Sequence, residues 1–194
     1  MRLTSAIIIS IIALLSHAQT LHVDNDLSHW EANICAGLNN DGYQVDFGAI
    51  YFPLQYIGIK ANIGTAGEIE TIEDWGNDDC ITHHEYAVRF KFIPAIVLRS
   101  PRIINWKSQD AGFYLFAEPG LILSPGASGS HNAKVVNWDF KGGVNLQLDR
   151  LIFFIGYGIS NYSLYSGRPR NYHGLPERNN YITHSAFIGT AYKF

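Results

Sequence analysis

Residues 135–160 read VVNWDFKGGVNLQLDRLIFFIGYGIS, and the alternation in this stretch decides the fold class. Residues 135–149 place apolar and polar side chains on opposite faces. The apolar face holds Val136, Trp138, Phe140, Gly142, Val144, Leu146 and Leu148, and the polar face holds Asn137, Asp139, Lys141, Gly143, Asn145 and Gln147. Asp149 and Arg150 then lead into a second alternating run that ends at Ser160. A two-residue period with a two-residue link predicts a long β-hairpin.

The same alternation recurs along the chain and predicts eight antiparallel strands. They cover residues 30–38, 43–51, 57–64, 86–92, 113–120, 136–148, 151–160 and 185–194. Short links near 53–55 and at 149–150 contrast with long polar links at 65–83, 124–134 and 162–180, so turns gather at one end of the sheet and loops at the other. The course of residues 94–110 stays open, because Pro94 and Pro101 interrupt a strand-like stretch and a central strand tolerates proline badly.

Composition limits the class of protein before any motif is considered. The chain has 194 residues, of which 47% are hydrophobic, 13% aromatic and 16% charged, with a net charge of −3. A nucleic-acid partner normally needs a Lys/Arg-rich face, which this balance does not supply. Two cysteines exclude a disulfide scaffold, and the sequence contains no CxxC pair to hold zinc.

The N-terminus has the pattern of an export signal. Arg2 precedes an apolar run from Ala6 to Leu15, and the small residues Ser16 and Ala18 follow it. This pattern predicts a signal peptide over residues 1–18, cleaved before Gln19. We expect residues 19–28 to form an N-terminal periplasmic segment and residues 29–194 to form a single barrel.

The chemistry of the polar face distinguishes a soluble barrel from a transmembrane one. Its positions are rich in glycine, whereas the apolar face carries no charged residue on any expected strand. Small residues suit a crowded lumen, and an uncharged apolar exterior suits lipid. The expected fold is therefore an all-β, eight-stranded antiparallel up-and-down transmembrane β-barrel. Buried charges must be paired, so we expect lumen ion pairs among Glu31, Asp46, Lys60, Arg89, Lys91, Glu118, Asp139, Lys141 and Lys193.

Three segments carry a resemblance to a known family. They are the chain end, where Ala186, Ile188, Thr190, Tyr192 and Phe194 alternate, the strand Trp138–Val144, and the segment Phe116–Gly120. On these residues the mature chain resembles small outer-membrane β-barrel proteins of Gram-negative bacteria, in the outer-membrane β-barrel domain family with PorT-like and OmpA-OmpX-like members. The resemblance implies outer-membrane localisation, and it implies that Ile188, Tyr192 and Phe194 form an insertion signal for the barrel assembly machinery. Members of this family share no single activity, so no catalytic residue is carried over.

Catalytic chemistry on such a barrel would need a serine, a histidine and an acid close together. His184 and Ser185 are adjacent in sequence, so alternation places them on opposite faces of the strand. We therefore expect no enzymatic activity and no cofactor.

The longest polar link contains the acidic loop residues Glu68, Glu70, Glu73, Asp74, Asp78 and Asp79. Oxygen-rich loops can hold Ca²⁺ or Mg²⁺, but the spacing is not that of an EF-hand, so a solvated surface is the favoured interpretation and metal binding stays an alternative. Arginines in the last long link suggest contact between loops, or divalent ions that bridge the acidic loop to lipopolysaccharide phosphates. Whether Cys35 and Cys80 form a disulfide is left open.

Two function classes follow, and an enzyme is a third. The favoured one is a non-enzymatic outer-membrane barrel with a packed polar lumen, whose outward loops serve a structural or surface-interaction role. The first alternative is a porin-like barrel for small-molecule transport, and the second is a lipid-modifying enzyme. Eight strands leave little room for a channel, which favours the first class. The expected partners are outer-membrane lipid, lipopolysaccharide and an unknown extracellular partner, with the chain itself a monomer.

Overall fold

The computed structural model describes residues 29–75, 80–106, 111–126, 133–166 and 182–194. The expected signal peptide and the segment 19–28 lie outside these residues. Within them, no helix is long and apolar enough to cross a lipid bilayer. The described residues contain β1 (Trp30–Asn39), β2 (Gly42–Leu54), β3 (Ile57–Trp75), β4 (Cys80–Arg99), β5 (Ile104–Trp106), β6 (Ala111–Leu123), β7 (Val136–Leu148), β8 (Leu151–Ser160) and β9 (Thr183–Lys193).

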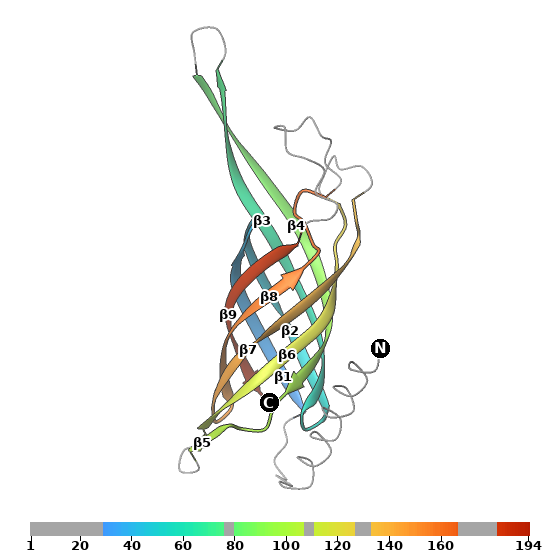
Figure 1. Cartoon of the computed structure of the whole chain (residues 1–194), viewed down its shortest axis with the longest axis vertical. Coiled ribbons are helices and arrows are strands. Elements are labelled where there is room, and N and C mark those ends of the chain that lie inside the picture. The colour runs from blue at the N-terminus through green and yellow to red at the C-terminus, as the bar shows by residue number, and fades with distance from the viewer. Residues whose placement is uncertain (1–28, 76–79, 107–110, 127–132, 167–181) are drawn as a thin grey trace, which may run out of the picture.

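Eight of these strands form a closed antiparallel barrel (Figure 1). Consecutive long strands pair with each other, β1 pairs with β9, and β4 pairs with β6 to complete the wall. The short strand β5 adds to the outer edge of β6 beyond the barrel rim. Closure leaves the long strands without free edges inside the wall, which is what a β-structure needs in order to span a membrane. The predicted eight-stranded fold is confirmed.

The alternation of side chains places apolar residues outside and charged residues inside. Ile34, Phe90 and Ile155 are 52%, 70% and 62% exposed on the outer face. Asp46 and Arg89, on strands β2 and β4, are each only 1% exposed because they point into the lumen. Soluble monomers rarely expose a continuous apolar surface of this kind, whereas a transmembrane barrel requires one.

Aromatic side chains gather at both ends of the apolar wall. At the end where β1 begins and β9 finishes, the Trp30 and Tyr51 rings lie 4.9 Å apart and the Tyr192 and Phe194 rings lie 5.6 Å apart. At the opposite end the Tyr157 hydroxyl lies 2.8 Å from Nδ1 of His184. Amphipathic rings favour the two membrane–water interfaces, so these groups mark the limits of the embedded band.

The expected long loop over residues 65–83 is wrong, because most of it is strand. The β3–β4 register continues without a gap from Glu68↔Ala87 to Trp75↔Cys80, while β3 pairs with β2 only as far as Gly67. The two strands therefore extend beyond the barrel as a protruding hairpin (Figure 1). A hydrogen-bonded ladder satisfies its backbone without an apolar face, which is why a polar sequence here still forms strand.

The course of the chain after Pro94, which the sequence does not decide, begins as a continuation of the same strand. β4 runs to Arg99, and β5 resumes pairing with β6 after Pro101. The proline has not ended the strand, because its fixed φ is compatible with extended backbone and it removes only one hydrogen-bond donor.

Two tight turns, at residues 55–56 and 149–150, lie at the end where the chain terminates, and the connection from β4 to β6 at this end is longer and contains β5. The 149–150 turn places Asp149 at a φ of 53°, in the left-handed region that two-residue hairpin turns use. The described loops 124–126, 133–135 and 161–166 lie at the other end, together with the β3–β4 hairpin. The division into a turn end and a loop end follows the sequence-based prediction, apart from the short turn at residues 40–41 at the loop end and the longer connection from β4 to β6 at the turn end, within the stretch that the sequence leaves open.

Candidate functional site

The lumen is crossed by a ladder of charged and amide side chains, which starts near the turn end with Glu31 and Arg99. The Arg99 guanidinium donates from two nitrogens to the two Glu31 carboxylate oxygens, at 2.7 and 2.6 Å. The ring of Phe52 lies 4.1 Å from the guanidinium carbon and that of Tyr114 lies 5.2 Å from it. The bidentate pair and the two neighbouring rings hold Arg99 in one orientation.

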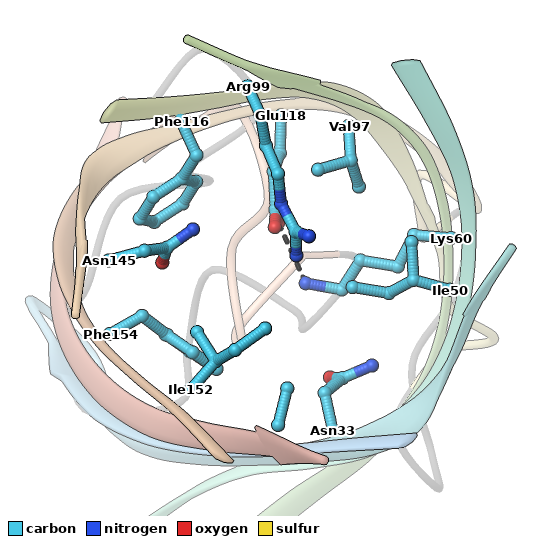
Figure 2. A pocket seen from close by; sticks show the side chains of 11 residues that line it. Asn33, Ile50, Lys60, Val97, Arg99, Phe116, Glu118, Asn145, Ile152 and Phe154 are labelled. Atoms are coloured by element: carbon cyan, nitrogen blue, oxygen red, sulfur yellow. Dashed lines mark hydrogen bonds and ion pairs between the residues drawn. The ribbon is translucent and has the colours of Figure 1, made fainter. Parts of the chain in front are cut away.

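The middle of the ladder joins β3 to β6 and β1, which each lie two strands away along the wall. Lys60 Nζ lies 2.7 Å from Glu118 Oε2, and both side chains are buried (Figure 2). Beside them, the Asn33 and Asn62 amides donate to each other, at 3.1 and 2.7 Å. Each of these groups has a partner that replaces water, which makes burial of the polar ladder tolerable.

Asp46 is the centre of the upper part of the ladder. Lys91 Nζ lies 3.0 Å from one of its carboxylate oxygens and Lys141 Nζ lies 3.4 Å from the other. Lys141 also lies 3.5 Å from Asp139, and Lys91 donates to Gln44 at 3.1 Å. One carboxylate thus holds two ammonium groups from strands β4 and β7, so three strands of the wall depend on it.

The loop end of the lumen is closed by residues 161–166, which fold inward after β8. Tyr162 and Leu164 are 3% and 1% exposed and pack with Ala66, Ile93 and Ile122. Leu164 N–H donates to Asp41 at 3.0 Å, and the Thr183 hydroxyl donates to the Tyr162 carbonyl. Burial raises the pKa of the Tyr162 hydroxyl to about 12, so it stays protonated near neutral pH. We call residues 161–166 the inner turn.

Arg89 fastens the inner turn to the wall. Its guanidinium donates to the carbonyls of Ser163, Ser124 and Pro125, and it lies 5.0 Å from the Tyr162 ring centre. These acceptors come from the loop after β6 and the loop after β8. A single side chain on β4 therefore ties two loops together across the mouth of the barrel.

We expect Arg89→Met to release the inner turn without unfolding the barrel. Methionine keeps an apolar stem but removes every hydrogen bond to the two loops, so hydrogen exchange at residues 161–166 should accelerate strongly. Mass spectrometry of the protein in nanodiscs measures this exchange. Arg89→Lys serves as a graded control, since one ammonium cannot reach both loops as the planar guanidinium does. Unchanged exchange in Arg89→Met would contradict the fastening role.

A small cavity remains between the lower and middle parts of the ladder. Figure 2 shows its lining from several strands, with Lys60, Arg99 and Glu118 beside Val97, Phe116 and Phe154. The centre of a water molecule has about 10 Å³ in which to move, which is close to the minimum for one bound water. The described lumen therefore has no open passage at this level.

The other residues predicted from the sequence lie in three regions of the barrel. Lys193 reaches Gln147 Oε1 at 3.5 Å near the turn end, and Arg89 binds carbonyl oxygens where an ion pair was expected. Ile188, Tyr192 and Phe194 are exposed on the outer face. Of the acidic residues, Glu68, Glu70, Glu73 and Asp74 lie on β3, while Asp78 and Asp79 lie outside the described residues.

Arg99 was missed, although the inward alternation of Arg89 and Lys91 leads to it once β4 is followed past Pro94. Cys35 is buried in the lumen with a free thiol beside Phe116 and Phe187, so it forms no disulfide. Ser185 is buried and His184 is exposed, on opposite faces as predicted. Within the described residues, no three His, Cys, Asp or Glu side chains form a metal-binding group.

Comparison with known proteins finds similar folds and no family. No protein-family profile and no curated protein matches the sequence. A de novo designed transmembrane β-barrel has a TM-score of 0.48 and 13% identity, covering 86% of this chain and 96% of that chain. The outer membrane enzyme PagL has a TM-score of 0.43 and 10% identity, covering 84% of this chain and 99% of that chain. Neisserial surface protein A (NspA) has a TM-score of 0.43 and 11% identity, covering 85% of this chain and 94% of that chain.

Proposed function

We propose that this chain is a non-enzymatic outer-membrane barrel whose protruding β3–β4 hairpin contacts a partner outside the cell. The observation that carries the proposal is the hairpin itself, which continues past the last β2 pair at Gly67 and, on the other strand, begins well before the first β6 pair at Phe92. Beyond these points, in the described part of the chain, the hairpin strands pair only with each other. Strand edges of this kind are templates for pairing with another extended segment.

The charge of the hairpin indicates the chemistry of its partner. Residues 61–88 include seven Asp or Glu and no Lys or Arg. An acidic extension attracts basic segments and repels acidic ones, which favours selectivity as well as fast association. The barrel wall faces lipid and the lumen is filled, so the loop end is the surface that remains for recognition. The assignment of the outer membrane rests on the apolar wall, the expected signal peptide and the C-terminal alternation.

Shortening the hairpin should remove recognition and leave the barrel intact. Because Glu68 and Ala87 are directly paired, residues 69–86 can be replaced by an Asn-Gly turn. We expect the shortened protein to remain heat-modifiable on gels, since loop tips tolerate such changes. In fluorescence anisotropy, a labelled decalysine peptide should bind the full protein in nanodiscs and lose that binding to the shortened one, while a Gly-Ser peptide binds neither.

Two further measurements separate this proposal from its alternatives. Planar bilayers containing the full protein should show no conductance steps, because the inner turn and the ion-pair ladder fill the lumen. Protease added to whole cells should cut near Arg168 or Arg170, which lie outside the described residues, and should spare the 149–150 turn. Steady conductance would favour the transport function, and equal decalysine binding by the shortened protein would refute the role of the hairpin.

A further inference from the structure

The seam between β4 and β6 closes the barrel, and its pairing is sparser than that of the other long strands. The paired residues are Phe92↔Leu123, Ala95↔Gly120, Leu98↔Ala117 and Arg99↔Phe116, whereas β6 pairs with β7 without a gap along its whole length. The strands are nevertheless close, since a Cβ on Gly120 would lie 2.7 Å from that of Ala95. Missing hydrogen bonds therefore need a cause other than separation.

Pro94 removes one donor from this seam. Successive residues of an antiparallel strand direct their backbone groups to alternate neighbours. Ser100 N–H donates to the Leu115 carbonyl of β6, so Pro94, an even number of residues earlier, also faces β6. The register places Pro94 opposite Leu121. Because proline has no N–H, the Leu121 carbonyl receives no ladder bond from this position.

Pro119 removes a second donor from the same seam. Ser124 N–H donates to the Val135 carbonyl on the β7 side, so Pro119, an odd number of residues earlier, faces β4. The register places it opposite Ile96, whose carbonyl loses its ladder bond in turn. Two successive hydrogen-bonding pairs are thus each missing one bond, in the middle of the wall. Proline is normally confined to strand edges, so each strand has an edge-like side here.

The cavity in the lumen lies beside this seam, although neither proline lines it. The register sets Val97 opposite Glu118, and both side chains line the cavity. On the outer side of the same seam, Ile96 and Leu121 are exposed on the wall that faces lipid. Arg99 lines the cavity as well, and its buried Nε–H has no hydrogen-bond partner in the described residues. The seam is one part of the wall between this cavity and the lipid-facing surface, and its residues line the cavity together with residues of the other six barrel strands.

We propose that the wall parts between β4 and β6 and admits one hydrocarbon chain of a membrane lipid into the cavity. The resting cavity holds about one water, so entry is coupled to separation of the strands. The two prolines lower the free-energy cost of that separation, because fewer ladder hydrogen bonds have to break. The cavity lining is mixed, with Lys60, Arg99 and Glu118 among its charged members. A chain would contact its apolar members, such as Val97, Phe116 and Phe154. The inner turn closes the loop end, so the route is lateral.

A photoreactive lipid tests this route. The probe is a phosphatidylcholine with a diazirine in its acyl chain, mixed into nanodiscs that hold the full protein, and adducts are mapped by tandem mass spectrometry. We expect adducts at the lipid-facing Ile96 and Leu121 and also at the lumen-facing Val97 or Phe116. The Pro94→Ala/Pro119→Ala variant restores both donors and should give about tenfold fewer lumen adducts.

Pro53→Ala is the matched control, because Pro53 lies on β2 away from the seam, and it should label as the unmodified protein does. Adducts confined to lipid-facing residues would overturn the proposal, as would lumen adducts that persist in the double variant. Equal labelling at Leu164, a lumen residue of the inner turn outside the cavity lining, would also overturn it, because that result indicates a loosened barrel rather than a defined opening.

Discussion

Asp46→Asn should destabilise the folded barrel by about 3–5 kcal/mol, the cost of removing one partner from a buried ion pair. Asparagine has nearly the same shape as aspartate, so the loss is one of charge. Lys91 and Lys141 would remain buried with their shared carboxylate gone, since the two ammonium groups lie 3.0 and 3.4 Å from Asp46. Urea unfolding in lipid vesicles, followed by tryptophan fluorescence, measures the difference.

Asp139→Asn is the matched control for this prediction. Asp139 contacts Lys141 at 3.5 Å, but Lys141 keeps its second carboxylate in that variant, and Lys91 keeps Asp46. The loss should therefore be clearly smaller. If both variants unfold at the same urea concentration as the original protein, the ladder contributes little to stability, and its role would be to fill the lumen.

The positions of the lumen charges could be predicted from sequence, but their partners could not. A two-residue period shows which side chains point inward, and it correctly places Glu31, Lys60 and Glu118 in the lumen. Lys60 pairs with Glu118 through the lumen, between strands that are not neighbours, and Glu31 pairs with Arg99 in the same way. Such pairs depend on strand tilt and stagger, which the period does not contain.

The two largest differences between the sequence-based prediction and the structure have different physical causes. The β3–β4 hairpin was expected to be a loop because its residues are polar, but paired strands outside the membrane need no apolar face. The inner turn was expected to be part of a solvated loop, although Tyr162 and Leu164 are apolar residues that can fill the mouth of a narrow barrel. Composition thus indicates whether a segment is embedded in lipid, but it does not indicate whether the segment is ordered beyond it.

Ile155→Arg should destabilise the barrel by about 2–4 kcal/mol, the cost of an arginine on the lipid face at the middle of a bilayer. Ile155 lies midway along β8, pairs with Val144 on one side and Ile188 on the other, and points outward. The new guanidinium has only hydrocarbon around it there. Urea unfolding in vesicles measures the loss, and Val144→Arg, on the neighbouring strand at the same level, should behave alike.

Leu151→Arg separates this effect from a general intolerance of arginine. Leu151 is on the same strand and the same outer face, but it adjoins the 149–150 turn, where the side chain can reach water. Arginine near an interface costs about 0–1 kcal/mol. A loss at Leu151 as large as that at Ile155 would mean that depth does not matter, and the outer face would then not be the lipid-facing one. A graded loss, largest in the middle of the strand, requires a bilayer around the barrel, because no aqueous environment makes position along the strand decisive.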